Sequence, residues 1–171
     1  MKAINRIIDR ARANPGRIVL CEGDDPRVLQ AGLRATREGT ARILLVGDRA
    51  RITQVAENEA IDLSGMTLID PADSPLAEGY AEELFRLREK KGLTRAAAAD
   101  EVRKPLVFAN LMVRMGDADG SVAGAVHTTA DVVRTAIQVI GTDPAFKLVS
   151  SFFLMMLCEP FHSLKGGLIF S

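Results

Sequence analysis

Apolar residues follow two different spacings along this chain. Short unbroken apolar runs predict buried strands, whereas apolar positions three or four residues apart predict helices. The runs that indicate strands are residues 18–20, 43–46, 67–69 and 121–126. The helical spacing occurs in the stretches 4–11, 26–39, 52–55, 76–92, 105–115 and 131–140. Continuously apolar strands that alternate with helices predict an α/β fold, a three-layer αβα sandwich around a mostly parallel sheet.

Residues that favour helix ends support these boundaries. Asp25 is expected to cap the helix that starts at Pro26, since an aspartate accepts first-turn N–H groups and a proline is tolerated in the first turn. Thr94 is expected to cap a further helix. The helix over residues 105–115 is apolar around most of its circumference, which predicts burial on two sides.

Charge and composition narrow the classes of partner. The 22 basic residues balance 22 acidic residues, so a polyanionic partner such as nucleic acid is not expected. Cys21 and Cys158 have no neighbouring cysteine or histidine at metal-ligand spacing, which fits a reducing, cytoplasmic setting. Residues 1–13 carry charges throughout, and the apolar run 148–158 is shorter than the roughly 20 residues that cross a bilayer. Neither a signal peptide nor a membrane segment is predicted.

The composition changes near residues 141–144. Beyond them, we expect a strand from Lys147 through Leu157, a loop, and a second apolar run at residues 168–170 just before Ser171. A strand at a chain end leaves backbone donors and acceptors without a partner, which a complete domain avoids. The chain is therefore expected to be truncated or incompletely covered.

The segment 124–131 places small and hydroxylated residues between a predicted strand and the next helix. Ligands of open α/β sheets bind beyond the carboxyl ends of strands, and N–H groups at a helix N-terminus attract anions. Thr128, Thr129 and Arg134 are the groups expected to bind a phosphate there. On spacing alone, a purely structural role fits at least as well, with Thr129 as N-cap, His127 as a loop residue and Arg134 as a solvated charge.

Other candidate residues have simple structural explanations. Arg88 belongs to the basic cluster 86–91 at a helix end, where the helix dipole stabilises cations. Asp117 and Asp119 resemble part of a calcium loop, but the bidentate glutamate of such a loop is missing, so no metal site is predicted. No dinucleotide-binding, Walker A or nucleophile-elbow motif occurs in the sequence.

One stretch of the chain resembles a known family. Residues 119–134, together with residues 136–138 and 150–153, resemble the phosphotransacetylases and the related phosphate butyryltransferases. The resemblance extends with lower stringency to the segments 22–27, 87–92 and 167–170. It covers all 171 residues, but only about half of a family member.

The resemblance implies reversible transfer of an acetyl group between acetyl phosphate and coenzyme A, with CoA as co-substrate and no tightly bound cofactor. It implies two α/β domains similar to those of isocitrate and isopropylmalate dehydrogenases, with the active site between them, and a homodimer of the full-length protein. Residues 1–145 are then a first domain that lacks its C-terminal return segment, and residues 146–171 are the first strands of a truncated second domain. The family's proposed base, an aspartate, and its charge-stabilising serine lie beyond Ser171, so no catalytic residue is expected in this chain.

The resemblance also assigns substrate contacts residue by residue. Arg88 and Arg134 correspond to the arginines that the family uses for anionic substrate groups. The turn 124–131 corresponds to the family's substrate-side loop. Its expected substrate-binding residues are Gly124, His127, Thr128 and Thr129. Cys158 corresponds to a family cysteine that lies near the active site but is not required for activity.

Thr135 departs from the family pattern, because many members have a proline after the arginine. Three alternatives to a phosphate acetyltransferase stay open. They are a phosphate butyryltransferase, a non-catalytic fragment or regulatory module of the kind fused to malic enzymes, and, least favoured, a nicotinamide dehydrogenase of related fold.

Overall fold

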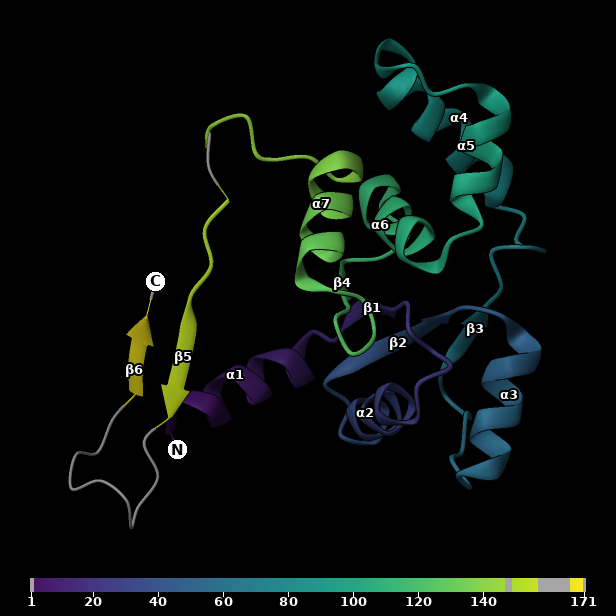
Figure 1. The fold of residues 1–171 in the computed structure, drawn as a ribbon. Coiled ribbons are helices and arrows are strands. Elements are labelled where there is room, and N and C mark those ends of the chain that lie inside the picture. The colour runs from purple at the N-terminus through teal and green to yellow at the C-terminus, as the bar shows by residue number, and fades with distance from the viewer. Residues whose placement is uncertain (1, 147–148, 157–166, 171) are drawn as a thin grey trace.

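The computed structural model describes residues 2–146, 149–156 and 167–170. Its helices are α1 (Lys2–Ala13), α2 (Pro26–Arg37), α3 (Arg49–Asn58), α4 (Ala77–Arg88), the 3₁₀ turn η1 (Glu89–Lys91), α5 (Arg95–Val102), α6 (Pro105–Met115) and α7 (Thr129–Val139). Its strands are β1 (Gly16–Leu20), β2 (Ala41–Val46), β3 (Thr67–Ile69), β4 (Gly120–Val122), β5 (Phe153–Met156) and β6 (Gly167–Phe170). Helices separate the first four strands along the chain, as the apolar spacing predicts (Figure 1).

Strands β1 to β4 form one parallel sheet in the order β3-β2-β1-β4. β1 lies inside the sheet, where Val19 is opposite Leu44 of β2 and Ser121 of β4. β4 is an edge strand, reached from β1 only after the chain has formed β2, β3 and the helices between them. The predicted α/β fold with a parallel sheet is confirmed.

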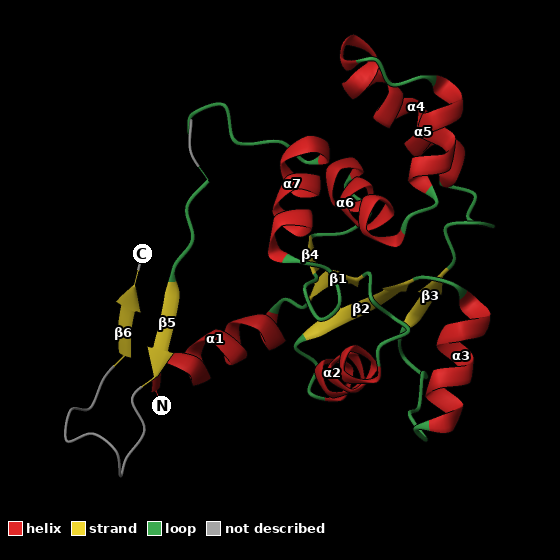
Figure 2. Ribbon diagram, in the orientation of Figure 1, coloured by secondary structure: helices red, strands yellow, loops and turns green. Residues whose placement is uncertain are grey.

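Helices cover both faces of this sheet (Figure 2). Val19 and Val46 pack on one face with side chains of α4, α5 and α6, whereas Leu20 and Leu45 pack on the other with side chains of α2 and α3. Adjacent residues of one strand serve opposite faces because successive side chains point to opposite sides. The strands are apolar at both sets of positions for this reason, and the predicted three layers are confirmed.

The helix ends agree with their expected caps. Asp25 accepts a hydrogen bond from the backbone N–H of Arg27 at 2.9 Å, and Pro26 is the first residue of α2. Thr94 accepts one from the backbone N–H of Ala97 at 3.2 Å at the start of α5. Both caps satisfy a donor that an isolated helix leaves without a partner.

Helix α6 is the most deeply buried part of the helical layers. Its fully or almost fully buried residues are Leu106, Phe108, Ala109, Asn110, Leu111 and Met112. These consecutive positions do not share one face of a helix, which confirms the predicted burial on two sides. Throughout the described ranges, no helix has the length and apolar character needed to cross a bilayer.

The described end of the chain forms a second, antiparallel pair of strands. Phe153 of β5 lies opposite Phe170 of β6, and neither strand joins the four-stranded sheet. β6 confirms the strand expected at residues 168–170. The strand expected from Lys147 begins only at Phe153, and the ends of that prediction, residues 147–148 and 157, lie outside the described residues.

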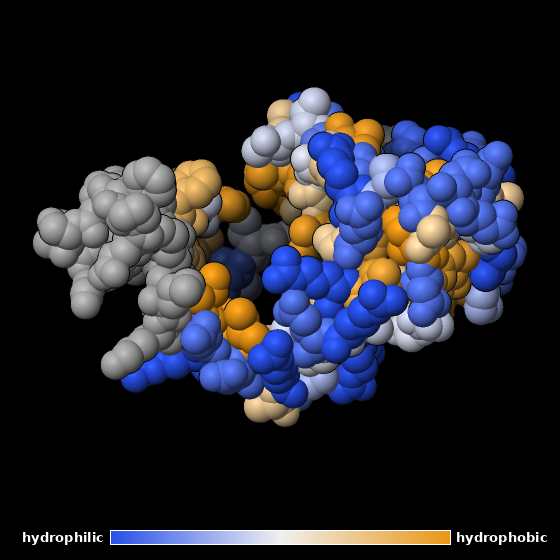
Figure 3. Space-filling view, turned by 90° about the horizontal axis from the view of Figure 1, so that it is seen from below, coloured by the Kyte–Doolittle hydropathy of each residue, from blue (hydrophilic) through white to orange (hydrophobic). Residues whose placement is uncertain are grey.

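The described surface is largely polar. Seen from below, hydrophilic residues cover most of it, with apolar side chains exposed between them (Figure 3). The large apolar side chains that remain exposed include Ile4 and Ile7 of α1, and Val122 and Val126 at the sheet edge. The helical spacing of α1 predicted its structure correctly, although Ile4 and Ile7 face solvent while Ile8 and Ala11 are half-buried.

Candidate functional site

The turns that follow β1 and β4 meet at one edge of the sheet. Because these two strands are parallel neighbours, their carboxyl ends lie side by side. β1 is followed by Cys21 and Glu22, and β4 is followed by the segment 123–128 that leads into α7. The prediction of a ligand site at this edge therefore has the geometry that open α/β sheets provide.

Glu22 lies at the centre of the site formed by the carboxyl ends of β1 and β4. The sequence alone did not identify it as a site residue. Its side chain is 3% exposed and accepts hydrogen bonds from four consecutive backbone N–H groups. These are the N–H groups of Gly124 at 3.0 Å, Ala125 at 2.8 Å, Val126 at 3.0 Å and His127 at 2.7 Å. The imidazole Nδ1 of His127 lies 2.8 Å from the same carboxylate. A glutamate in a turn with other acidic residues is usually exposed to solvent, so the local sequence does not predict its burial. The only signal for Glu22 was that residues 22–27 share the family resemblance.

Two opposing influences set the pKa of the Glu22 carboxyl. Burial, the larger single influence, raises the pKa because it removes water from the charged form. The backbone N–H groups of His127, Val126 and Ala125 and the His127 ring together outweigh burial and lower the pKa to about 2. Glu22 is thus ionised at neutral pH, and no lysine or arginine of the described residues is bonded to it.

This arrangement corrects one prediction. The amides of residues 124–127 are directed at Glu22. The strand expected over 121–126 ends at Val122, because the N–H groups beyond it donate to a side chain instead of to a neighbouring strand. Gly124 has a φ of 115°, which residues with a Cβ rarely adopt, and this glycine allows the turn.

The start of α7 holds the other predicted groups together. Thr128, and not Thr129, is the N-cap: its hydroxyl accepts the Asp131 N–H at 3.2 Å and donates to the Asp131 carboxylate at 2.6 Å. Arg134 donates to the other oxygen of Asp131 at 3.0 Å. Thr129 is the first residue of the helix and is exposed. A hydroxyl and a guanidinium therefore converge on one carboxylate.

Arg88 lies in a different part of the structure. It is the last residue of α4, which packs mainly against α5. Among the described residues it forms no ion pair, and no hydrogen bond joins it to segment 124–134. The structure brings Thr128 and Arg134 together but does not bring Arg88 to them. Cys158 lies outside the described residues.

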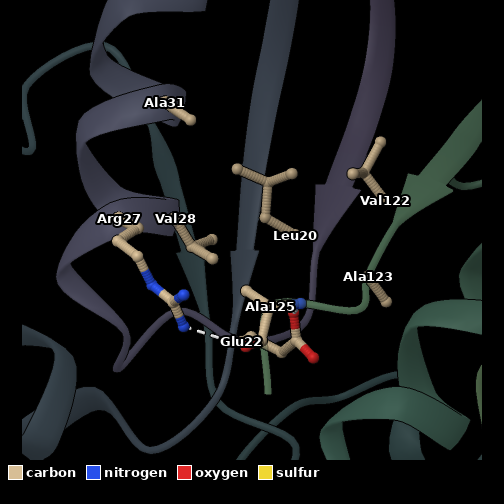
Figure 4. Close-up of a pocket in the computed structure, with 8 residues that line it drawn as sticks. All are labelled: Leu20, Glu22, Arg27, Val28, Ala31, Val122, Ala123 and Ala125. Atoms are coloured by element: carbon tan, nitrogen blue, oxygen red, sulfur yellow. Dashed lines mark hydrogen bonds between the residues drawn. The ribbon is translucent and has the colours of Figure 1, made fainter. Parts of the chain in front are cut away.

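A pocket of about 250 Å³ adjoins Glu22 (Figure 4). Its walls are mostly aliphatic and come from the end of β1, the start of α2 and the end of β4: Leu20, Glu22, Arg27, Val28, Ala31, Val122, Ala123 and Ala125. Arg27 closes one side by donating to the carbonyl of Ala125 at 2.8 Å while it pairs with Asp25 at 2.7 Å. The pocket has room for a small apolar group beside the buried carboxylate.

The neighbouring cysteine does not add chemistry to this edge. Burial and the charge of Glu22 raise the pKa of the Cys21 thiol to about 12, so it stays protonated and weakly nucleophilic. Among the residues that the structure describes, no three histidine, cysteine, aspartate or glutamate side chains are grouped to hold a metal.

The fold and the position of the site define the general class of protein to which the chain belongs. A parallel sheet whose carboxyl-end turns carry hydroxyls and an arginine belongs to the open α/β proteins, which bind ligands beyond the strand ends. Residues 2–171 match the family model described as "Phosphate acetyl/butaryl transferase", and the chain belongs to this family.

Similar proteins agree with this assignment. The chain is 42% identical over 171 residues to the phosphate acetyltransferase of Paracoccus denitrificans and 38% identical over 171 residues to that of Clostridium acetobutylicum. It covers 100% of its own length in both comparisons, but 50% and 51% of the relatives. The solved EutD phosphotransacetylase from Staphylococcus aureus superposes with a TM-score of 0.88 at 30% identity, over 99% of this chain and 49% of that one. The chain thus spans about half the length of the relatives it matches.

Proposed function

We propose that this chain is one wall of the active site of a phosphate acetyltransferase. The reaction is acetyl-CoA + phosphate = CoA + acetyl phosphate, with CoA as a co-substrate and no tightly bound cofactor. The observation that carries the proposal is that relatives named phosphate acetyltransferase match 95% to 100% of the chain at 38% to 42% identity. The acetyl group and the phosphate are small, which fits an edge with one small aliphatic pocket and one cluster of anion-binding groups.

The anion-binding groups that we propose are Thr128, Thr129 and Arg134 at the start of α7, with Arg88 as a second cation for the same substrates. Arg134 and Asp131 have side chains that are 61% and 46% exposed, so their ion pair costs little to open in water. A phosphate that replaces Asp131 beside Arg134 gains a charge-assisted hydrogen bond and the favourable end of the helix dipole. The expected contribution of this wall is binding and charge stabilisation, while the base and the serine come from residues beyond Ser171.

The larger organisation is part of the same proposal. Residues 1–145 form the first domain and residues 146–171 begin the second, in the manner of the isocitrate and isopropylmalate dehydrogenases. The whole protein is a cytoplasmic homodimer. Sedimentation of the protein at the full length of its relatives tests the dimer, and a monomer at assay concentration contradicts it.

The activity is tested by thioester formation from acetyl phosphate and CoA, followed by ultraviolet absorbance, with butyryl phosphate in parallel. We expect turnover with acetyl phosphate from the protein at the full length of its relatives and none from this chain alone. Preference for butyryl phosphate makes the protein a phosphate butyryltransferase instead. A full-length protein that folds but turns over neither substrate favours a non-catalytic, regulatory role.

The anion site is tested by Arg134→Ala in the full-length protein. We expect kcat/KM to fall about 10- to 100-fold, because a charge-assisted hydrogen bond to phosphate is worth about 1.5 to 3 kcal/mol. Arg37→Ala is the matched control, since Arg37 is an exposed arginine in the last turn of α2. Equal effects from both variants, or none from either, assign Arg134 to the solvated surface of α7.

A further inference from the structure

The contact between Glu22 and His127 stabilises the turn after β4, and it also orients the imidazole ring of His127. We propose that Glu22 is a positioning residue that fixes the His127 imidazole, so that its Nε2 atom takes up a proton from solvent and donates a hydrogen bond to the phosphate group of the substrate. The identity of the anion rests on the proposed function. The positioning of the ring rests only on contacts within this chain.

The contacts hold the imidazole ring in one orientation. The Oε1 atom of Glu22 accepts both the backbone N–H of His127 at 2.7 Å and its ring Nδ1 at 2.8 Å. Two bonds from one residue to one oxygen fix the main chain and the side chain together. Glu22 cannot turn away without losing the N–H groups of Gly124, Ala125 and Val126 as well. The ring therefore has a rigid support, as a carboxylate gives to a metal-bound histidine when it accepts the other ring N–H.

The same contact determines which nitrogen carries the proton. An ionised carboxylate only accepts hydrogen bonds, so Nδ1 of His127 is the protonated nitrogen. In the neutral ring, Nε2 is then an acceptor with an open lone pair. His127 keeps 34% of its side chain exposed, and among the described residues Nε2 has no hydrogen-bond partner. The ring thus presents a basic nitrogen that is available to a ligand.

A phosphate changes the charge that is preferred at Nε2. A lone pair facing an anion is unfavourable, whereas an imidazolium donates from Nε2 to the phosphate and from Nδ1 to Glu22. The step takes one proton from solvent, leaves it on Nε2, and breaks no covalent bond. Glu22 accepts the hydrogen bond from Nδ1 in both forms of the ring, so the ring keeps its orientation while its charge changes.

The other charged groups around the ring balance one another. At the start of α2, Arg27 pairs with Asp25 and bonds the carbonyl of Ala125. On α7, Arg134 pairs with Asp131. Glu22 is the one carboxylate bonded to the ring among the described residues. Because His127 directly precedes the N-cap Thr128, an anion at Nε2 also lies near the positive end of the α7 dipole.

The positioning is tested by nitrogen NMR of the histidine rings in the chain itself. The sequence has two histidines, His127 and His162, so His127→Gln assigns the signals by the set that disappears. We expect His127 to carry its proton on Nδ1, opposite to the preference of a free histidine side chain for Nε2. Glu22→Gln should move the proton to Nε2, while Glu38→Gln, which removes a carboxylate on α2's far end, should change nothing. A parent His127 protonated on Nε2 overturns the proposal.

The proton step is tested by calorimetry with inorganic phosphate in two buffers of different ionisation enthalpy. We expect proton uptake on binding by the parent, and for His127→Gln no uptake and about tenfold weaker affinity. His127→Gln leaves the Glu22 backbone contacts in place, so it reports on the ring even where Glu22→Gln fails to fold. Binding without proton uptake, or equal affinity in His127→Gln, overturns the proposal.

The two experiments separate this proposal from the proposed function. A parent that does not bind phosphate refutes phosphate as the ligand of this wall and refutes the proton step with it. The NMR result then stands or falls by itself as the test of whether Glu22 fixes the ring.

Discussion

The strand pair β1 and β4 is bridged by a carboxylate at each end. At the amino end, Asp119 accepts the backbone N–H of Arg17 at 2.7 Å and pairs with its guanidinium at 2.9 Å. At the carboxyl end, Glu22 accepts four backbone N–H groups and a ring nitrogen. The side chain of Asp119 is 52% exposed, whereas that of Glu22 is 3% exposed.

Both carboxyl groups have a pKa lowered to about 2, but for different reasons. The hydrogen bond from the Arg17 side chain is the largest influence on the pKa of Asp119, and together with the bond from the Arg17 backbone N–H it outweighs desolvation, which raises the pKa. For Glu22, burial opposes ionisation and backbone dipoles overcome it. Two carboxyl groups with equal pKa values can therefore differ in how much each contributes to the stability of the fold. A solvated ion pair can be lost to water, but a buried carboxylate leaves its donors unsatisfied.

The largest expected effect is that of Glu22→Gln on the free energy of unfolding. An amide nitrogen in place of one oxygen confronts the N–H groups of the turn, and the buried donors lose their charged acceptor. We expect a loss of about 3 to 4 kcal/mol, measured by urea unfolding of this chain. A loss below that of Asp119→Asn contradicts the contrast between the two ends.

The next effect is the acid sensitivity that Glu22 adds. Its folded-state pKa of about 2 lies below its usual 4.5, so its stabilisation is fully present above about pH 4.5 and is lost as the pH falls through 2. This contribution is about 3 kcal/mol at neutral pH. Unfolding free energies measured from pH 6 to 2 should therefore fall less steeply for Glu22→Gln than for the parent. Parallel curves show that Glu22 is not held ionised by the turn.

A smaller effect comes from the backbone of the turn itself. Gly124→Ala places a Cβ on a residue with a φ of 115°, which should cost about 1 to 2 kcal/mol although no neighbouring atom lies within 4 Å. Gly79→Ala is the matched control, because Gly79 lies inside α4 and its added Cβ also meets nothing. That control should gain about 0.5 to 1 kcal/mol from helix propensity. Urea midpoints that shift in the same direction remove the conformational argument.

Asp119→Asn should have the smallest effect. Asparagine can still accept the Arg17 backbone N–H, and the lost ion pair is exposed to solvent. We expect a shift in the urea midpoint much smaller than that of Glu22→Gln, and one that shrinks further at high salt because salt screens exposed charges. A salt-independent loss as large as that of Glu22→Gln makes the two ends equivalent.

Much of the fold was predictable from local patterns. Strand β3 was expected at residues 67–69 and is found there, and α6 was expected at residues 105–115 with the burial that it has. Asp25 and Thr94 cap the helices that they were expected to cap. These predictions succeed because burial and capping leave their pattern within a few residues of the chain.

The candidate site was only partly predictable. The sequence placed Thr128 and Arg134 near each other, since fewer than two helical turns separate them, but it assigned the N-cap to Thr129 and extended β4 too far. It did not identify Glu22 as the acceptor of the turn. The two segments of this site have no common pattern in the sequence, because neither one has a partner until the sheet has formed.

By itself, the sequence determined the class of fold, the segments that form it and the family to which it belongs, because apolar periodicity, helix caps and a contiguous motif are local properties. The tertiary structure alone decided that the turns after β1 and β4 meet. Glu22 and His127 are 105 residues apart in the chain, and the strand order β3-β2-β1-β4 makes them neighbours. The physical reason is that backbone N–H groups must find acceptors. Which acceptor they find depends on which strand lies alongside, and the strand order is fixed only when the strands pair and the helices pack on the sheet.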